Sequence, residues 1–353
     1  MDVRRATLLA AAVAGLVGCA GSSRLPAAAP AGPAAPVVVN IQRASVAVPA
    51  PDDAPADALA DPLPPRGPAT PDVLGCERPA AGWSPSTTIR IAVDVDPATN
   101  EGEFRRPVEI DVPQGPVLAR PLLVVLHSHA ADIRAARGYG WSNLPVADPP
   151  VVVYAQGLPE GRGGPLAWAS AGRTDFGIDD VAYLRAAVAA ARAATCVDGR
   201  RIFAAGFSNG GSMAGLLACQ AADLFAGVLS VAGNYYPVAG GCQPGRGVGI
   251  VEMHALDDPV VAYGGGPGRA PRTTSLPRVA DWVAGWTARD GCQPQLGQSS
   301  PAPGAVRQQW VACRDGAAVT HIRYDRFGHR WPDAGAVTND LWLWRELTSA
   351  ARS

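Results

Sequence analysis

Apolar residues recur in short runs along the chain from residue 87 onward, and glycine or polar residues follow most of these runs. Short apolar or alternating runs of this kind are typical of strands in a sheet. We expect strands at residues 87–93, 106–112, 121–126, 151–155, 202–205, 226–232, 248–254 and 318–324. Helical patterns occur at residues 179–194, 212–219, 275–289 and 337–350. Strands that alternate with helices predict an α/β fold: a doubly wound, mostly parallel sheet with helices on both faces.

Polar residues gather just after four of the expected strands, at positions 127–129, 208–210, 257–258 and 328–331. In an open parallel sheet, the loops at the carboxyl ends of the strands meet and form the binding site. We therefore expect these four segments to converge on one rim of the sheet.

The segment Gly206-Phe207-Ser208-Asn209-Gly210 has the pattern G-x-S-x-G between an expected strand and an expected helix. That is the context of a nucleophilic serine on a sharp turn. We predict that Ser208 has a strained backbone and a hydroxyl pushed clear of the sheet, with free N–H groups of the helix start beside it. The alternative is a glycine-rich turn whose serine is incidental.

A serine nucleophile needs an imidazole to take its proton and a carboxylate to orient that imidazole. Of the five histidines, His329 lies in a glycine-containing loop between the last strand and the last helix, where the order Ser, acid, His places the base. His321 is expected to be a packed or hydrogen-bonded strand residue. Asp257 and Asp258 both follow a strand, and the pattern does not separate them. The one that is not the acid is expected to cap the turn made with Pro259.

Taken together, these pieces resemble the exported polyhydroxybutyrate-depolymerase and feruloyl-esterase family of α/β-hydrolases, over residues 76–335. The matching pieces are Leu126-His127, Asp179-Asp180-Val181, the turn at 198–201, the serine motif at 206–211, Ala218-Cys219, residues 254–263 and Gly328-His329-Arg330-Trp331-Pro332. The family pattern His-Gly-Thr-x-Asp-x-x-Val falls on residues 254–261. The resemblance therefore implies an α/β-hydrolase fold with Ser208 as nucleophile, His329 as base and Asp258 as orienting acid.

The resemblance also implies an oxyanion hole made of backbone N–H groups. Asn209 supplies one donor, and the loop after His127 supplies the other. Here the chain departs from the family, because His127-Ser128-His129-Ala130 stands where small residues are usual. We assign the second donor to His129, with Ser128 as the alternative, and expect the added bulk to alter the geometry of the hole.

Tryptophans in or near these loops are candidates for substrate contact. We predict that Trp168 and Trp331 bind substrate, as an aromatic wall for a feruloyl ring or an aliphatic polyester. The alternative for each is a packed loop aromatic. The implied activity is hydrolysis of feruloyl- or acetyl-type esters or of hydroxyalkanoate oligomers, without a metal or cofactor. Two competing interpretations stay open: a weakly catalytic or non-catalytic binding lipoprotein on the same fold, and a serine peptidase or lipase.

The beginning of the chain predicts export. A basic start is followed by an apolar run that is too short to span a bilayer as a stable helix. The run ends in Leu16-Val17-Gly18-Cys19, which resembles the box of bacterial lipoproteins and implies that residues 1–19 are a signal peptide and that Cys19 is lipidated. The alternative is an ordinary signal peptide that is cut near Ala20.

Residues 20–74 are rich in Ala and Pro and are expected to form a disordered linker. Within it, residues 37–41 are the one place that could pair as a strand. Residues 75–353 are then the catalytic domain of an exported protein that is either tethered to a membrane by lipid or secreted.

The cysteine count and the net charge narrow the list of partners. Six cysteines besides the lipidation site favour disulfides in an exported chain. Chain proximity suggests the pairs Cys292–Cys313 and Cys219–Cys242, which leaves Cys76 with Cys196. No C-x-x-C pair or Cys/His cluster is present, so no metal site is expected. The formal net charge of −1 gives no sign of a nucleic-acid partner, and we expect a monomer.

Overall fold

A computed structural model of the chain describes most of the predicted catalytic domain. The described residues are 88–95, 104–114, 119–161, 163–171, 179–238, 240–268, 274–293, 297–332, 336 and 338–351. The predicted signal peptide with Cys19, the predicted linker with its possible strand at 37–41, and Cys76 lie outside them.

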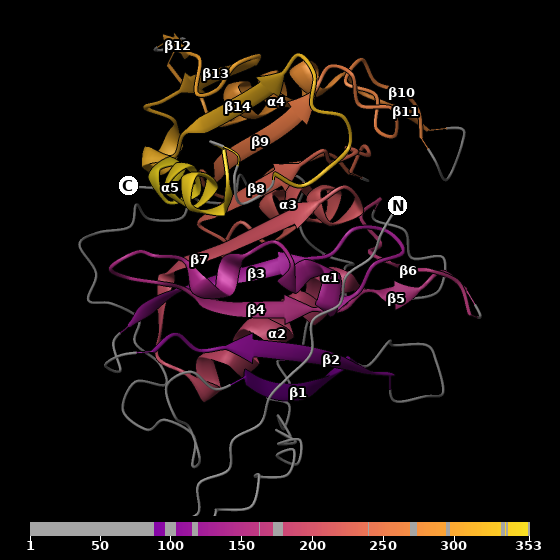
Figure 1. Ribbon diagram of the computed structural model, residues 1–353, viewed down its shortest axis with the longest axis vertical. Coiled ribbons are helices and arrows are strands. Elements are labelled where there is room, and N and C mark those ends of the chain that lie inside the picture. The colour runs from indigo at the N-terminus through magenta and orange to yellow at the C-terminus, as the bar shows by residue number, and fades with distance from the viewer. Residues whose placement is uncertain are drawn as a thin grey trace, which may run out of the picture. The chain divides into compact units, whose positions relative to one another are not determined.

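The described strands form one large mixed sheet, with order β1-β2-β4-β3-β7-β8-β9-β14-β13-β12 (Figure 1). The six strands from β4 to β14 in this order run parallel, and the pairs at both edges are antiparallel. Their bounds are β1 Thr88–Val95, β2 Phe104–Asp111, β3 Arg120–Leu126, β4 Val151–Ala155, β7 Val197–Phe207, β8 Gly227–Val231, β9 Gly249–Ala255, β12 Gly297–Ser299, β13 Ala305–Trp310 and β14 Val319–Tyr324.

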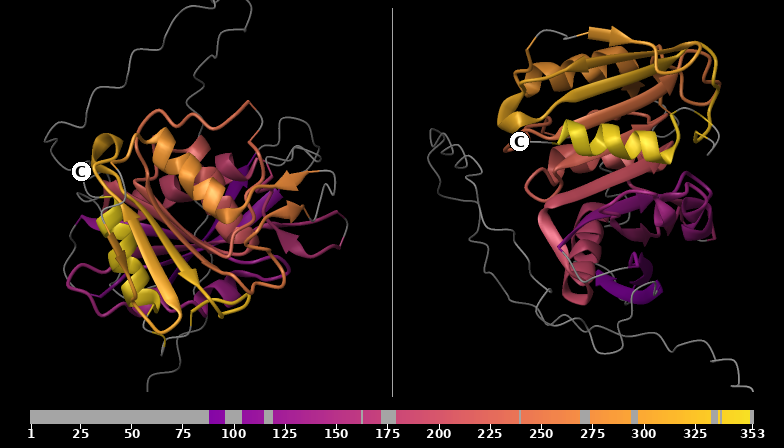
Figure 2. Two further views of the ribbon diagram at one scale, coloured as in Figure 1. Left: turned by 90° about the horizontal axis from the view of Figure 1, so that it is seen from above. Right: turned by 60° about the vertical axis from the view of Figure 1, so that its left-hand side comes forward.

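Helices cover both faces of this sheet, as Figure 2 shows. They are α1 Ile133–Arg137, α2 Asp180–Ala194, α3 Asn209–Gln220, α4 Val279–Arg289 and α5 Asp340–Ala350. Two short hairpins, β5–β6 (Leu158–Pro159 with Leu166–Ala167) and β10–β11 (Gly266–Pro267 with Ser275–Leu276), lie outside the main sheet. The predicted α/β-hydrolase architecture is confirmed.

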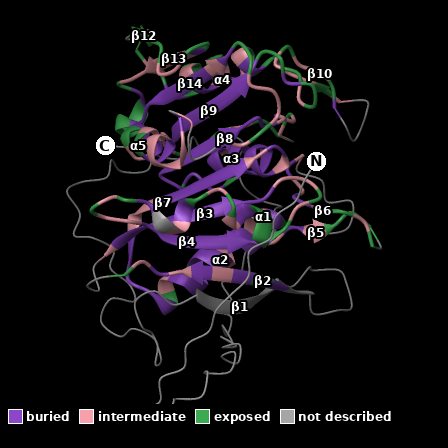
Figure 3. Cartoon of the chain, in the orientation of Figure 1, coloured by how far each residue is buried: buried purple, intermediate pink, exposed green. Residues whose placement is uncertain are grey.

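Successive side chains of the central strands enter two different cores, because side chains alternate across a strand. On β3, Leu122 and Val124 pack with residues of α2, α3 and α4, whereas Leu123 and Val125 pack with residues of α1 and α5. The central strands are buried along nearly their whole length (Figure 3). A sheet that is covered on both faces leaves the loops at the strand ends as the accessible part of the fold.

Two predicted helices start later than expected. The segment 275–289 begins as strand β11, which pairs with β10, and becomes helix only at Val279 because Pro277 and Arg278 lie between. The helix expected from residue 337 begins at Asp340, where the side chain of Asn339 accepts a hydrogen bond from Trp342 N. The strand β13, which lies between β14 and the edge strand β12, was not expected, since half of its sequence AVRQQW is polar and most of it is only partly buried.

The cysteine pairs proposed from chain proximity are bonded where the structure describes both partners, at Cys219–Cys242 and Cys292–Cys313. Cys196 is also disulfide-bonded, and its predicted partner Cys76 lies outside the described residues. Among the described helices, none has the length and apolar character needed to cross a membrane. Within the same residues, no group of three or more His, Cys, Asp or Glu side chains is arranged to hold a metal ion.

Candidate active site

Ser208 lies at the sharp turn between β7 and α3, with φ 55° and ψ −118°, a left-handed conformation that a non-glycine residue rarely adopts. Its N–H donates to Val231 O at 2.8 Å, which ties the turn to β8. A Cβ at Gly206 would lie 2.2 Å from Gly210 O, and one at Gly210 would lie 2.3 Å from Leu126 O. Both glycines of the motif are therefore required by close backbone approach.

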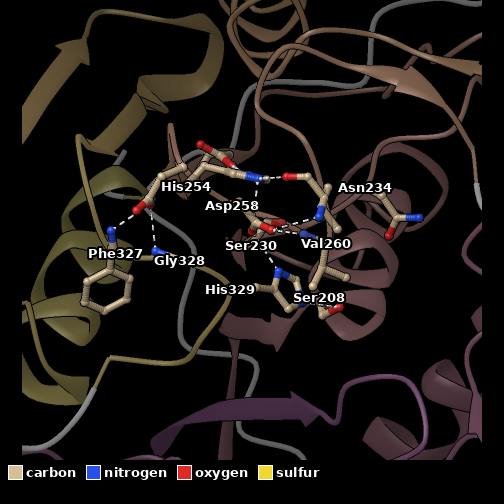
Figure 4. Close-up of polar contacts among 12 residues, drawn as sticks. Ser208, Ser230, Asn234, His254, Asp258, Val260, Phe327, Gly328 and His329 are labelled. Atoms are coloured by element: carbon tan, nitrogen blue, oxygen red, sulfur yellow. Dashed lines mark hydrogen bonds and ion pairs between the residues drawn. The ribbon is translucent and has the colours of Figure 1, made fainter.

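Three side chains from three different loops form a continuous hydrogen-bonded chain at this turn (Figure 4). The His329 Nε2 atom lies 2.9 Å from Ser208 Oγ, and its Nδ1 atom lies 2.7 Å from Asp258 Oδ2. Ser208 follows β7, Asp258 follows β9 and His329 follows β14, so the carboxyl ends of these parallel strands bring them together. This arrangement can move a proton from the serine hydroxyl to the imidazole.

The two adjacent aspartates have different tasks. Asp258 Oδ1 accepts the N–H groups of Val260 and Val261, both at 2.8 Å, which leaves Oδ2 for His329. Burial alone would raise the pKa of Asp258, but the hydrogen bonds from His329, Val261 and Val260 lower it, so the carboxylate is ionised at neutral pH.

The exposed neighbour, Asp257, holds the loop that carries the histidine. Its Oδ1 accepts the N–H groups of Phe327 at 2.9 Å and Gly328 at 2.8 Å. The expectation that the second aspartate caps the turn with Pro259 is wrong, because Asp258 itself accepts the N–H groups of that turn. No sequence signal indicated this role, because the bonded residues are about 70 positions away.

The loop after β3 lies against the start of α3, where the oxyanion donors are expected. His127 is fully buried: its Nδ1 bonds to Ser128 O at 2.8 Å and its Nε2 accepts Gly157 N–H at 2.9 Å. Burial lowers the pKa of His127, which fits a neutral ring that joins two loops. Ala130 N–H donates to Leu166 O. Among the described residues, nothing accepts the N–H of Asn209 or His129.

Trp168 differs from its predicted role, since it is 3% exposed and packs against His127 and Tyr183. Its backbone N–H donates to Asn209 Oδ1 at 2.7 Å, and its carbonyl accepts from Asn209 Nδ2 at 3.0 Å. Ser170 Oγ accepts from the same amide. Trp168 therefore positions the residue beside the serine and does not form a wall for substrate.

Half-buried aromatic residues gather on the side of His329. Trp331 stacks on Tyr139 with ring centroids 4.4 Å apart, and the ring of Phe207 lies 4.8 Å from that of His329. Trp141, by contrast, is buried, with its ring edge against Trp331. Trp331 thus lies near the site, and its contact with substrate stays a prediction. Tyr139 and Phe207 are additional aromatic residues near the site that were not predicted. Only Phe207 lies within a motif that the sequence indicated, the serine motif.

Known proteins that are similar to this chain are named as esterases or belong to a peptidase family. Residues 151–241 match the prolyl oligopeptidase family. Feruloyl esterase B of Piromyces equi is 30% identical over 177 residues, and feruloyl esterase C of Emericella nidulans is 31% identical over 159 residues. The chain is similar in sequence to feruloyl esterases over less than half of its length, and its fold is that of the α/β-hydrolases. A polyhydroxybutyrate-depolymerase relationship stays a prediction.

The chain spans only part of the length of several relatives. The matched segments cover 48% of the chain and 32% of the Piromyces equi protein, and 44% of the chain and 52% of the Emericella nidulans protein. NocK of Nocardia uniformis subsp. tsuyamanensis, provisionally named an esterase, is 29% identical over 62% of the chain and 68% of its own length. An acetyl xylan esterase from Aspergillus awamori shares the fold, with a TM-score of 0.50, 15% identity, and coverage of 65% of this chain and 91% of that one.

Proposed function

We propose that this hydrolase is an exported serine esterase that cleaves carboxylic esters through Ser208, His329 and Asp258. The observation that carries the proposal is the hydrogen-bonded chain from Ser208 Oγ to His329 Nε2 at 2.9 Å and from His329 Nδ1 to Asp258 Oδ2 at 2.7 Å. A serine on a strained turn at a helix start, with an imidazole and an ionised carboxylate in line, is the arrangement that acyl transfer requires.

In the first half of the reaction, Ser208 Oγ attacks the ester carbonyl and its proton passes to His329 Nε2. The negative charge that develops on the carbonyl oxygen is stabilised by the N–H groups of Asn209 and His129. The tetrahedral intermediate collapses, the bond to the alcohol oxygen breaks, and His329 gives its proton to that oxygen. Asp258 remains ionised and holds the imidazolium in place.

In the second half, a water molecule attacks the acyl group on Ser208 while His329 takes one of its protons. Collapse of this intermediate returns that proton to Ser208 Oγ and releases the carboxylic acid. The cycle uses one water per ester and regenerates the free enzyme. All of its proton transfers pass through one imidazole, so no further acid or base is needed.

We infer that the acyl or alcohol group packs against Tyr139, Phe207 and Trp331. These half-buried rings lie on the side of His329, where an aromatic or aliphatic group of the ester gains apolar contact. Feruloyl and acetyl esters are the substrate classes that the names of the relatives suggest. A feruloyl group makes fuller use of these rings than an acetyl group does, because aromatic surface buries more area.

Export and lipid attachment at Cys19 belong to the same proposal. The disulfides at Cys219–Cys242 and Cys292–Cys313 support an oxidising compartment. Replacement of Cys19 by Ala should convert a detergent-extracted protein into one that leaves the membrane fraction in buffer alone. Retention of the variant in the membrane would contradict the lipid anchor.

The test of the activity is hydrolysis by wild type and Ser208→Ala of methyl ferulate, a short aryl acetate, 3-hydroxybutyrate oligomers and a peptide anilide. We expect ester hydrolysis that Ser208→Ala abolishes. Ser300→Ala, at an exposed serine away from the turn, is the matched control and should keep full activity. Cleavage of the peptide alone would support a peptidase, which the match to prolyl oligopeptidases makes the second candidate. No Ser208-dependent turnover would support a binding protein.

A further inference from the structure

A cluster of buried titratable side chains lies beneath the proposed catalytic acid, on one face of β8, β9 and β14. We call Glu252, His254, His321 and Tyr235 the buried histidine cluster. The side chain of Glu252 has no exposed surface, and neither has that of His254. Register pairs Glu252 with Ser230 on β8 and with His321 on β14. None of these groups takes part in the proposed reaction, and burial of so many polar groups is costly unless they are paired.

Glu252 is the centre of the cluster. Its Oε1 atom lies 3.1 Å from His254 Nδ1 and accepts the hydroxyl of Tyr235 at 3.0 Å. Its Oε2 atom lies 2.7 Å from His321 Nδ1, at ion-pair distance but without the alignment of a hydrogen bond. His321 Nε2 lies 2.9 Å from the hydroxyl of Tyr263. One buried carboxylate therefore faces two imidazoles and a phenol.

His254 connects this cluster to the catalytic acid (Figure 4). Its Nε2 atom donates to Val261 O at 2.8 Å and lies 3.5 Å from Asp258 Oδ2. Val261 also supplies one of the N–H groups that hold Asp258 Oδ1. The ring of His254 thus contacts both the carboxylate that orients His329 and the turn that fixes this carboxylate.

The hydrogen-bond partners determine where the protons of His254 lie. A carbonyl oxygen only accepts, so Nε2 carries a proton that it donates to Val261. An ionised Glu252 also only accepts, so Nδ1 carries a second proton and the ring is an imidazolium. Burial alone would raise the pKa of Glu252, but His254 and His321 lower it to about 2. Burial alone would lower the pKa of His254, but Glu252, Val261 and Asp258 raise it.

We propose that His254 is a positioning residue: a buried imidazolium, held by Glu252, that keeps Asp258 ionised and fixes the turn at 258–261. The inference rests on the proposed function, since its effect is exerted through Asp258 on His329. A cation at 3.5 Å favours the ionised form of the carboxylate. Because like charges repel, it also disfavours a second positive charge on His329.

The other charged and titratable groups described near His254 come from β14, α4, β8 and the loop after β9, and none of them lies between its ring and the carboxylates of Glu252 and Asp258. Arg323 stands beside it in register on β14, and the ring of Tyr263 lies 5.9 Å away in an edge contact. On the side of α4, the rings of Trp282 and Tyr235 stack with their centroids 3.7 Å apart. The charges of Arg278 and Asp281 have opposite effects on the pKa of Tyr263. Ser230 on β8 bonds to the hydroxyl of Tyr235. The anions closest to His254 are thus Glu252 and Asp258, one on each side of its ring.

The test separates the charge of His254 from its hydrogen bond. His254→Gln keeps an N–H donor for Val261 O and removes the charge, whereas His254→Ala removes both. Glu252→Gln leaves the ring in place and removes the anion that holds its second proton. Tyr235→Phe is the mildest change, because the ring stays stacked on Trp282 and only the bonds of the hydroxyl to Glu252 and Ser230 are lost. It serves if the other variants do not fold.

The measurement is the second-order rate of labelling of Ser208 by a fluorophosphonate between pH 5 and 9, together with ester hydrolysis. We expect the acidic limb of both profiles to move to higher pH by roughly one unit in His254→Gln and Glu252→Gln. Tyr235→Phe should move it in the same direction by less. His254→Ala should lose about 10²-fold in kcat, since the turn is released as well.

Asp290→Asn is the control for a purely structural effect. Asp290 is a buried carboxyl bonded to Arg314 at the other end of β9. This variant should change thermal stability without moving the profile. An unmoved limb in a folded His254→Gln, Glu252→Gln or Tyr235→Phe, beside a wild type that hydrolyses esters through Ser208, overturns this inference alone. A wild type without Ser208-dependent labelling or hydrolysis overturns the proposed function and this inference with it.

Discussion

Exchange of each of two neighbouring aspartates for its amide tests the triad with a matched pair of variants. In Asp258→Asn, the side-chain oxygen should stay with the N–H groups of Val260 and Val261, because both lie 2.8 Å from Oδ1. The new NH₂ group then takes the place of Oδ2, 2.7 Å from His329 Nδ1. Two donors face each other unless Nδ1 loses its proton. His329 would then carry its proton on Nε2, where it cannot accept the proton of Ser208.

This tautomer change sets the magnitude. Loss of the acid to its amide in a serine triad costs about 10⁴-fold in kcat, and we expect a decrease of that order here. It corresponds to about 5 kcal/mol of lost transition-state stabilisation. Asp257→Asn keeps an oxygen that can accept the N–H groups of Phe327 and Gly328, so its kcat should stay within about threefold of wild type.

The assay is steady-state hydrolysis of a short aryl ester, with circular dichroism and thermal melting as controls for folding. A folded Asp258→Asn with kcat within tenfold of wild type would refute the assignment of the acid. Equal losses of kcat in the two variants would show that the contact of Asp257 with the histidine loop matters as much as the contact of Asp258 with His329.

Three further predictions concern stability. Gly210→Ala would place a methyl group 2.3 Å from Leu126 O, so thermal melting should show a loss of stability of about 3 kcal/mol or more. The methyl group of Gly297→Ala would meet no atom within 4 Å, so this variant should melt like wild type. Reduction of Cys292–Cys313, at a sequence separation of 21, should lower the free energy of unfolding by about 3 kcal/mol in denaturant titrations; an unchanged midpoint would contradict this. Burial raises the pKa of Asp290 from 3.8 to about 6, so the folded state binds its proton more tightly than the unfolded state does. About 3 kcal/mol of stability should therefore be lost as the pH rises from about 3 to about 7. Asp290→Asn should remove that slope, and a slope that persists in the variant would show that other groups cause it.

The strands of the sheet centre could be predicted because their sequences are continuous apolar runs, as at residues 121–126, and both faces are in fact covered. The strand β13, next to the edge, could not, since a partly exposed strand with the sequence AVRQQW has no apolar run. The start of α4 was misplaced because apolar pattern does not reveal a two-residue pairing such as β10 with β11.

For the site, the order of residues along the chain and their positions in loops were enough to predict that Ser208 and His329 lie together. The choice between Asp257 and Asp258 needed the family pattern, because adjacent carboxylates differ only in the direction of their side chains. Trp168 was predicted to bind substrate because its loop lies near the site. The sequence does not reveal that its side chain is buried in that loop. The buried histidine cluster joins β9 to residues up to 69 positions away, and no local pattern indicates such a contact.

The central claim is that Ser208 carries the acyl group of an ester. Acid quenching of the enzyme during turnover of an aryl ester, followed by peptide mass spectrometry, tests it most directly. We expect an acyl adduct on the peptide that contains Ser208. It should be absent from Ser208→Ala and should accumulate when release of the acid is slow. Continued ester hydrolysis by Ser208→Ala, or an acyl group found on another residue, would contradict it.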